Sequence, residues 1–588
     1  MLAGAAAAAW LPAPAFAQEV PAGALPPTRE EIERAPLRPT VEAAPRLTVE
    51  GDVERAPCAL AGDAYRNLTF TVSSVAFEDL KGVAPAHLAP AYAEYIGTTQ
   101  PVAVICEIRD RAATILREAG YIAAVEVPEQ RIAEGAIRFQ VLMARLVAIR
   151  VRGNAANAER TIAGYLERLT EEEVFNRFHA ERYLLLAGDL PGYDVRLALR
   201  SAGAGRGEVI GEVAVLRSPG QIDLNVQNFG SRSLGRWGGL LRGQFYGLTG
   251  LGDRTTVALF STADFEEQRT LQLGHDFRVG SEGLTLSGQF TYAWANPDLD
   301  DDRFDIKSTT MLATVEAAFP FIRTQAQTLR GSFGLDIIDQ DVRLVDVTDL
   351  TRDRLRVLFS RVDYEAVDTD SLSRIGGFSA AEPRWRFAGG LELRHGVDIF
   401  GGSEDCRNGG CKAPAVPISR LEGDPTGTVL RFESFGEYRP VPNITFALGV
   451  RGQYSNDPLL SFEEFSAGNY TVGRGYDPGA LLGDRGIGVQ AELRYGTIVP
   501  AALDRFSFQP YVFFDAAWVG NEDRGNRLDV RQNLSSVGGG IRALYGDRVQ
   551  LDVALAVPLE AAGLLTKERP DPRLLVSLTT RLWPWRSR

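Results

Sequence analysis

The chain has 588 residues, which exceeds one ordinary domain, and its hydrophobic content of 45% and charged content of 24% are those of a folded protein. A formal net charge of −13 argues against a nucleic-acid partner, because such a partner requires a basic surface. After the first 17 residues the apolar runs are too short for helical membrane spans.

Residues 1–17 have the composition of a signal peptide. They are rich in Ala and end in Ala15-Phe16-Ala17, a small-x-small cleavage pattern that would leave Gln18 as the mature N-terminus. The basic leader expected ahead of the apolar core is absent from this segment, and an unstructured Ala/Pro tail is the competing interpretation. We expect a signal peptide and therefore export.

Residues 18–66 form an N-terminal linker that is rich in Pro, Ala and charge. Within it, 28–35 could form two helical turns, with Thr28 as N-cap and Glu31 completing a capping box. Prolines on both sides limit the length of that helix. A flexible linker is the alternative interpretation.

Two α/β modules of similar order follow, module 1 at 67–145 and module 2 at 146–217. Each is expected to contain a strand, two helices and two closing strands. For module 1 these are Phe70–Phe77, Pro85–Glu94, Val102–Ala119, Ala123–Val127 and Ala136–Ala144. For module 2 they are Leu146–Val151, Asn157–Leu169, Glu173–Ala187, Asp194–Leu199 and Glu208–Leu216. The exposed sheet edges could accept an extended peptide as an extra strand, and the plainer alternative is that the modules are spacers.

The four cysteines suit an oxidising compartment and allow three full pairings. Proximity in sequence favours Cys406 with Cys411, which leaves Cys58 with Cys106. A metal site needs further ligands, and none of the 4 His lies near these cysteines, so we expect neither a metal nor a cofactor.

From 218 to 588 the chain alternates apolar and polar residues over stretches of about ten residues. In Val549–Val557 every second residue is Val or Leu, and the residues between are Gln, Asp and Ala. Period two indicates β-strands, and strands of this length cross a bilayer when tilted. We therefore predict a transmembrane antiparallel β-barrel of about 16 strands with a wet lumen, in a bacterial outer membrane. Longer polar insertions, expected on the outer side, are Asn296–Lys307, Glu365–Ser373 and Gly401–Gly423.

One long glycine-rich segment, Phe465–Gly486, is centred on Arg474-Gly475-Tyr476 and differs from an ordinary barrel loop. In the later strand Tyr511–Trp518, alternation predicts that Phe513 and Asp515 face the lumen while Val512, Phe514, Ala516 and Trp518 face lipid.

A carboxylate among lumen aromatics is partly desolvated and needs a partner. Arg474 on an inward-folding loop would supply a two-pronged donor to Asp515. Gly475 would let the backbone turn where a side chain would clash, and Tyr476 could pack on the neighbouring strand. The plainer interpretation is that this pair only stabilises the barrel.

Together these features resemble the two-partner secretion transporters of the ShlB/FhaC/HecB haemolysin secretion and activation family, within the BamA-like superfamily. The resemblance rests on the Arg-Gly-Tyr loop, the Phe513-x-Asp515 strand, and matches in the two upstream modules and at the entry into the first barrel strand. Those matches are Gly120-Tyr121-Ile122, Pro128, Gln130, Gly135, Leu190-Pro191-Gly192 and Asn228-Phe229-Gly230-Ser231. The sequence departs from the family pattern at Gly473, where Val is usual, and at Ala517, where Gly is usual.

The resemblance implies that modules 1 and 2 are POTRA domains in the periplasm. They would recognise an unfolded partner around Tyr121, Pro128, Gln130, Gly135 and Pro191-Gly192. The partner would be a large exoprotein with an N-terminal secretion domain, passed through a monomeric pore in outer-membrane lipid. It also implies that the pairing of Arg474 with Asp515 holds the loop in a conducting or gating position and that 28–35 plugs the lumen at rest.

Two related functions compete with export of a partner protein. A BamA-like insertase shares the Arg-Gly-aromatic loop but usually carries more POTRA domains, and a general porin would not need the modules. Gly479–Gly486 lacks the Lys-Ser/Thr of a phosphate loop, and no catalytic triad is apparent, so we expect no enzyme.

Overall fold

A computed structural model describes residues 26–33, 58, 60, 62, 65, 67–132, 134–153, 158–202, 207–298, 305–345, 348–373, 377–405, 416–522, 532–563 and 568–584. The predicted signal peptide and the Cys406–Cys411 pair lie outside these residues. Among the described helices, none has the length and apolar character needed to cross a membrane.

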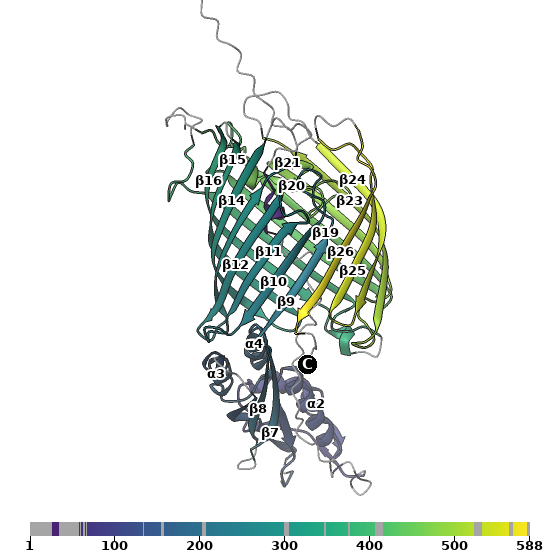
Figure 1. Cartoon of the computed structure of the whole chain (residues 1–588). Coiled ribbons are helices and arrows are strands. Elements are labelled where there is room, and N and C mark those ends of the chain that lie inside the picture. The colour runs from purple at the N-terminus through teal and green to yellow at the C-terminus, as the bar shows by residue number, and fades with distance from the viewer. Residues whose placement is uncertain are drawn as a thin grey trace, which may run out of the picture.

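Sixteen strands in the described part of the chain form one closed antiparallel barrel, which confirms the predicted fold class (Figure 1). Every strand pairs with its neighbour in sequence, except that β19 pairs with β22 and the last strand pairs with the first. The strands are β9 Gly220–Gln227, β10 Gly238–Tyr246, β11 Arg254–Thr262, β12 Gln268–Val279, β13 Leu284–Ala295, β14 Ile306–Arg323, β15 Gln327–Leu344, β16 Thr348–Val367, β17 Trp385–Gly396, β18 Thr428–Val441, β19 Ile444–Ser455, β22 Arg485–Tyr495, β23 Phe506–Gly520, β24 Gln532–Tyr545, β25 Val549–Pro558 and β26 Arg573–Trp583.

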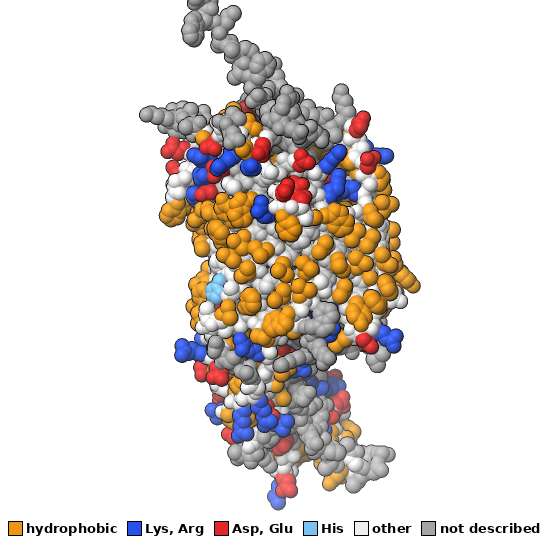
Figure 2. Space-filling view, viewed as in Figure 1, with side chains coloured by type: hydrophobic (Ala, Val, Ile, Leu, Met, Phe, Trp, Pro, Cys, Tyr) orange, Lys and Arg blue, Asp and Glu red, His pale blue; other side chains and the backbone are white. Residues whose placement is uncertain are grey.

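Alternation along each strand produces an apolar outer surface and a polar lumen. In β23, Val512, Phe514 and Trp518 are exposed on the outside, whereas Phe513 and Asp515 are buried. Ala516 is also buried. Figure 2 shows the result as a hydrophobic band around the middle of the barrel, with charged residues gathered above and below it.

The two modules lie below one end of the barrel, which we call the module end (Figure 1). Module 1 contains β1 Thr69–Thr71, β2 Ser74–Glu78, η4 Pro85–Ala91, η5 Ala93–Tyr95, β3 Thr99–Pro101, α2 Val104–Glu118, β4 Ala123–Glu126 and β5 Ala136–Met143. Module 2 contains β6 Arg145–Gly153, α3 Glu159–Glu167, η7 Arg168–Thr170, α4 Arg177–Gly188, β7 Tyr193–Ser201 and β8 Glu208–Arg217. The main sheets have the orders β2-β5-β4 and β6-β8-β7, and each buries an apolar core against its helices.

Three details of the modules and connections differ from the sequence predictions. The strand expected over Phe70–Phe77 is two strands, because the chain leaves β1, paired with β3, and joins a different sheet at β2. The helix expected from Glu173 begins at Arg177, because Asn176 takes the N-cap position and its side chain accepts from Phe178 N at 2.8 Å. The short helix expected at Pro85–Glu94 consists of 3₁₀ turns.

The insertion Glu365–Ser373 was expected on the outer side, and this expectation is wrong. Strand β16 extends through Val367, and the segment that follows contacts the β22–β23 turn, where the carboxylate of Glu382 accepts from Ile498 N at 3.0 Å. Because β9 enters from module 2 and strands alternate in direction, the β16–β17 connection must fall at the module end.

Module 2 is bonded to the turns at the module end of the barrel. Asp189 accepts both guanidinium prongs of Arg323, at 2.7 and 2.6 Å, and Arg182 reaches the carbonyl of Pro320 at 3.0 Å. The β10–β11 turn beneath is shaped by Asp253, which accepts bonds from the backbone of residues 248–250. Burial raises the pKa of Asp253, but these hydrogen bonds outweigh burial and leave the pKa below its usual value. The modules are thus fixed to the barrel by directed polar contacts.

The short helix α1, Arg29–Glu33, lies inside the barrel (Figure 1). Thr28 N donates to Glu31 Oε2 at 2.9 Å, and Glu31 N donates to Thr28 Oγ1 at 3.3 Å, which is the reciprocal pattern of a capping box. Residues 34 and 35 of the predicted helix lie outside the described residues.

Candidate functional site

The connection between β19 and β22, residues 456–484, folds into the lumen, and we call it the lumen loop. It contains η9 Ser461–Glu463 and a small hairpin of β20 Phe465–Ala467 with β21 Leu481–Gly483. Glycines allow its sharp turns, since Gly473 has a φ of 116° and Gly475 a φ of 95°. A Cβ on Gly473 would lie 2.5 Å from Leu534 Cδ1, so this chain has no space for the Val that is usual before the Arg.

Arg474 binds two carboxylates on the lumen wall, and we call this set of contacts the latch. Its Nε donates to Asp515 Oδ2 at 2.8 Å and its Nη2 donates to Asp515 Oδ1 at 2.6 Å, while Nη1 donates to Glu492 Oε1 at 2.6 Å. The backbone N of Arg474 also donates to Asp515 Oδ2, at 3.0 Å. Because Asp515 is fully buried, its carboxylate is cut off from water, and these donors compensate for the lost hydration.

Aromatic side chains complete the latch. The guanidinium carbon of Arg474 lies 3.6 Å from the ring centroid of Phe513, which is a cation–π geometry. Tyr476 is 1% exposed, and its hydroxyl donates to the carbonyls of Ser535 and Glu560, at 2.8 and 2.9 Å. The structure therefore brings together the five residues that the sequence singled out in the loop and strand.

Glu492 and Arg542 also belong to the latch network, and the sequence analysis missed them. Glu492 accepts from Arg494 Nε at 2.8 Å and from Arg542 Nη2 at 3.0 Å, in addition to Arg474. Arg542 in turn donates to Asp552 at 2.9 Å. Strand pairing was the signal that could have pointed to Glu492. Strands β22 and β23 are adjacent in the barrel, and their register sets Glu492 opposite Phe513, two residues from Asp515.

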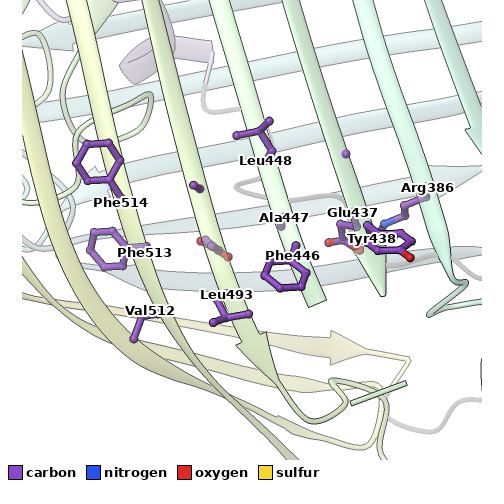
Figure 3. A pocket seen from close by; sticks show the side chains of 13 residues that line it. Arg386, Glu437, Tyr438, Phe446, Ala447, Leu448, Leu493, Val512, Phe513 and Phe514 are labelled. Carbon is purple, nitrogen blue, oxygen red and sulfur yellow. Dashed lines mark ion pairs between the residues drawn. The ribbon is translucent and has the colours of Figure 1, made fainter. Parts of the chain in front are cut away.

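The network continues along the wall toward the module end. Arg494 Nη1 donates to Glu437 Oε1 at 2.5 Å, and Arg386 Nε lies 2.8 Å from Glu437 Oε2. Figure 3 shows Arg386 and Glu437 on the neighbouring strands β17 and β18, and Phe513 three strands further on, in β23; all three line a pocket in the wall together with apolar side chains such as Phe446 and Leu493. Charged side chains therefore line the lumen wall from the latch to the module end.

A second buried charge cluster holds the start of the lumen loop and α1. Arg394, 1% exposed, donates to Asp336 at 2.7 Å and to Glu463 at 2.9 and 2.8 Å. Arg29 of α1 lies 3.5 Å from Asp336 and 3.7 Å from Glu463. Arg29 of α1 and Arg394 of β17 therefore share two carboxylates, Asp336 of β15 and Glu463 of the lumen loop.

The predicted partner-binding residues of the modules occupy turns and joints. Tyr121 donates its hydroxyl to the carbonyl of Gly82 at 2.8 Å and pairs through its backbone with Asn176 of module 2. Gln130 is bonded to the backbone of Arg138 in both directions at 2.8 Å.

The module glycines are required by close backbone contacts. A Cβ on Gly135 would lie 1.9 Å from Thr71 O, and one on Gly192 would lie 2.5 Å from Ser218 O. Pro191 stands in the turn before β7, and Pro128 follows β4. These are shaping roles, and binding of a partner around these residues stays a prediction.

Cys58 and Cys106 form a disulfide with their Cα atoms 5.9 Å apart, which ties the linker to the first turn of α2.

Comparison with known proteins agrees with this architecture. The model of the haemolysin secretion/activation protein family ShlB/FhaC/HecB matches residues 214–543, more than half of the chain, and that of the ShlB-type POTRA domain matches residues 70–143. No curated protein matches the chain. The solved structure of CdiB from Escherichia coli is similar with a TM-score of 0.69 and 16% identity, over 94% of this chain and 96% of that chain. CdiB from Acinetobacter baumannii has a TM-score of 0.60 and 17% identity, over 90% and 91%.

At these identities the solved structures establish the fold, while the family match covers most of the barrel. The chain therefore belongs to the ShlB/FhaC/HecB haemolysin secretion/activation family and is an outer-membrane transporter of two-partner secretion, with its POTRA region in the periplasm.

Proposed function

We propose that this transporter recognises a large exoprotein, through an N-terminal secretion domain of that partner, and secretes it unfolded to the cell surface or the medium. Modules 1 and 2 would act as two POTRA domains that capture the partner. The edge strands β2 and β4 of one sheet, and β6 and β7 of the other, support capture by strand addition. Because one chain closes a complete barrel, the pore in outer-membrane lipid is proposed to be monomeric and to act without catalysis.

We propose further that α1 plugs the lumen at rest. Ile32 is fully buried against side chains of the barrel wall and the lumen loop. Arg451 Nη2 donates to Glu30 at 2.6 Å, and Gln272 Nε2 donates to the carbonyls of Ile32 and Glu33 at 3.0 and 2.7 Å. These contacts support a helix that is specifically held in the lumen and that must leave before a polypeptide passes.

The latch would keep the lumen loop in the position that permits passage. The observation that carries this proposal is the fully buried Asp515, whose two oxygens are bound by the fork of Arg474. Removing one partner of such a pair typically costs about 3–5 kcal/mol. A purely structural role and a transport role both predict some loss of folded barrel, and they differ in export per folded barrel.

The test replaces Arg474 with Ala and measures secreted partner divided by the amount of folded barrel, judged by heat-modifiable gel mobility. We expect export per barrel to fall at least tenfold, and Arg474→Lys to fall as well because an ammonium cannot bind both oxygens in a fork. The matched control is Arg330→Ala, a half-exposed arginine on β15 whose nearest carboxylate, Glu316, is 3.6 Å away. Unchanged export per barrel in Arg474→Ala would remove the transport role.

Capture by module 1 is tested by deleting residues 70–144 and measuring binding of the partner's secretion domain. Undiminished binding would show that module 1 is not a receptor. If cells that carry this deletion lose other outer-membrane proteins but still export the partner, the result would favour the insertase alternative.

A further inference from the structure

The barrel is closed by pairing its first strand with its last, and this seam has a short backbone ladder. It runs from Gln227 opposite Ser577 to Ile222 opposite Trp583, with an irregularity before Trp583. By comparison, β15 and β16 are paired along nearly their whole length. A short ladder leaves the seam dependent on other contacts.

At the outer end of the seam, beyond Gln227 and Ser577, one further backbone bond joins the strands, from Asn228 N to Val576 O at 3.2 Å, and side chains add to it. Asn228 of the β9 side donates to Leu574 O at 2.7 Å and accepts from Val576 N at 2.7 Å. Arg573 of β26 donates to the carbonyls of Asn228 and Gly230, both at 3.1 Å. Four bonds that involve a side chain and one backbone bond thus join the two strands here.

The lumen loop binds both sides of this same outer end through Asp477. From β26, Arg573 Nη1 donates to Asp477 Oδ1 at 2.8 Å. From the β9–β10 connection, Arg236 Nη1 donates to Asp477 Oδ1 at 3.3 Å and Arg232 N donates to Oδ2 at 3.2 Å. We call these contacts the Asp477 bridge.

Two further loop residues contact the β9 side beside the bridge. Gln227 Nε2 donates to Tyr470 Oη at 3.2 Å, and Asn469 Nδ2 donates to Phe229 O at 3.2 Å. In addition to the Arg394–Glu463 contact at its start, the loop is therefore fixed to the wall at β22–β23 by the latch and at the seam by the Asp477 bridge.

We infer that Asp477 is a positioning residue that keeps the seam closed, so that a polypeptide in the lumen leaves at the outer mouth and not sideways into lipid. Without its carboxylate, Arg573 and Arg236 would face each other across the seam with no shared anion. This inference does not rest on the gating role of the latch, because the contacts involved lie on different strands.

The test combines Asp477→Ala with a covalent lock on the seam. Leu224 and Thr580 are opposed in the ladder, on the same outward face as Val226 and Leu578, so cysteines introduced there can form a disulfide without altering the lumen. The readouts are the temperature at which the purified full chain loses its compact gel mobility, and the sensitivity of cells to an antibiotic too large for the intact outer membrane.

We expect Asp477→Ala to lower the transition temperature by several degrees and to raise antibiotic sensitivity several-fold, and the oxidised lock to restore both. The control is Asp515→Ala, which frees the loop from β23 without touching the seam, and which the lock should not restore. Protein that is otherwise wild type, with and without the cysteine pair at positions 224 and 580, is measured under the same oxidising conditions to show the effect of oxidation alone.

Three outcomes would overturn the inference: no effect of Asp477→Ala, no restoration by the lock, or equal restoration of Asp515→Ala. If Asp477→Ala yields no folded barrel, recovery of folded barrel in the locked background supports the inference and its absence overturns it. Arg236→Ala, which removes one contact from a half-exposed side chain, should give a smaller shift in the same direction.

Discussion

Replacing Ile32 with Ala should release α1 from the lumen. Ile32 is fully buried in an apolar cluster formed by the inward side chains of β13–β16 and by the lumen loop. Its other members are Ala293, Leu312, Ile338, Leu355, Val357, Leu460 and Phe462. In a lumen lined mainly by polar groups, this cluster is the apolar contribution to holding the helix.

The size of the effect follows from burial. Ile→Ala in a core costs about 2–5 kcal/mol, and a helix of five residues packed on one side belongs at the low end, about 2 kcal/mol. Since about 1.4 kcal/mol is tenfold in an equilibrium constant, the ratio of released to seated helix should rise roughly 30-fold. The polar contacts of Arg29 and Glu30 remain and limit the shift.

The assay is the open fraction of single channels of the purified protein in planar lipid bilayers. Ile32→Ala should spend a much larger fraction of time in the high-conductance state, with unchanged heat-modifiable mobility because the barrel itself is intact. Pro26→Ala, a half-buried position just before the helix, is the matched control and should resemble wild type. An Ile32→Ala channel with the open fraction of wild type would refute the argument that apolar burial holds the helix.

Three other variants test separate contacts. Gln272→Ala removes both bonds to the last carbonyls of α1 and should raise the ratio of released to seated helix roughly 30-fold, at about 1 kcal/mol for each of the two net hydrogen bonds. Replacing Cys58 and Cys106 with Ser opens a cross-link over 48 residues and should destabilise module 1 by about 2–4 kcal/mol, seen as faster proteolysis of that module at an unchanged barrel transition. Asp253→Ala removes the acceptor that shapes the β10–β11 turn and should make module 2 more susceptible to protease at neutral pH. Because the folded pKa of Asp253 is depressed, the wild-type advantage should be present above about pH 4 and disappear as pH falls through the folded pKa.

Much of this architecture could be predicted because strand periodicity is local. Alternation along segments such as β25 and β26 indicated a barrel. The number of residues after position 218 predicted about 16 strands, and the structure has sixteen in the described part of the chain. Arg474 and Asp515 could be paired because a buried carboxylate requires a donor, whatever the distance in sequence.

Apart from the Arg474–Asp515 pair, the sequence did not indicate where separate segments meet. Glu365–Ser373 was assigned to the wrong side because the side of a connection depends on the parity of all preceding strands, which local composition does not contain. Glu492 and Arg542 were missed because a charged residue on a lumen face looks the same with or without a partner.

By itself, the sequence determined the barrel, the two modules and the Arg474–Asp515 pair of the latch, since each follows from periodicity or from the chemistry of one motif. Only the tertiary structure decided that Arg29 of α1 meets Asp336 of the wall and Glu463 of the lumen loop, and that Asp477 bridges the seam. The physical reason is closure: when the first and last strands pair, residues more than 300 positions apart become neighbours, and no local pattern encodes which of them will touch.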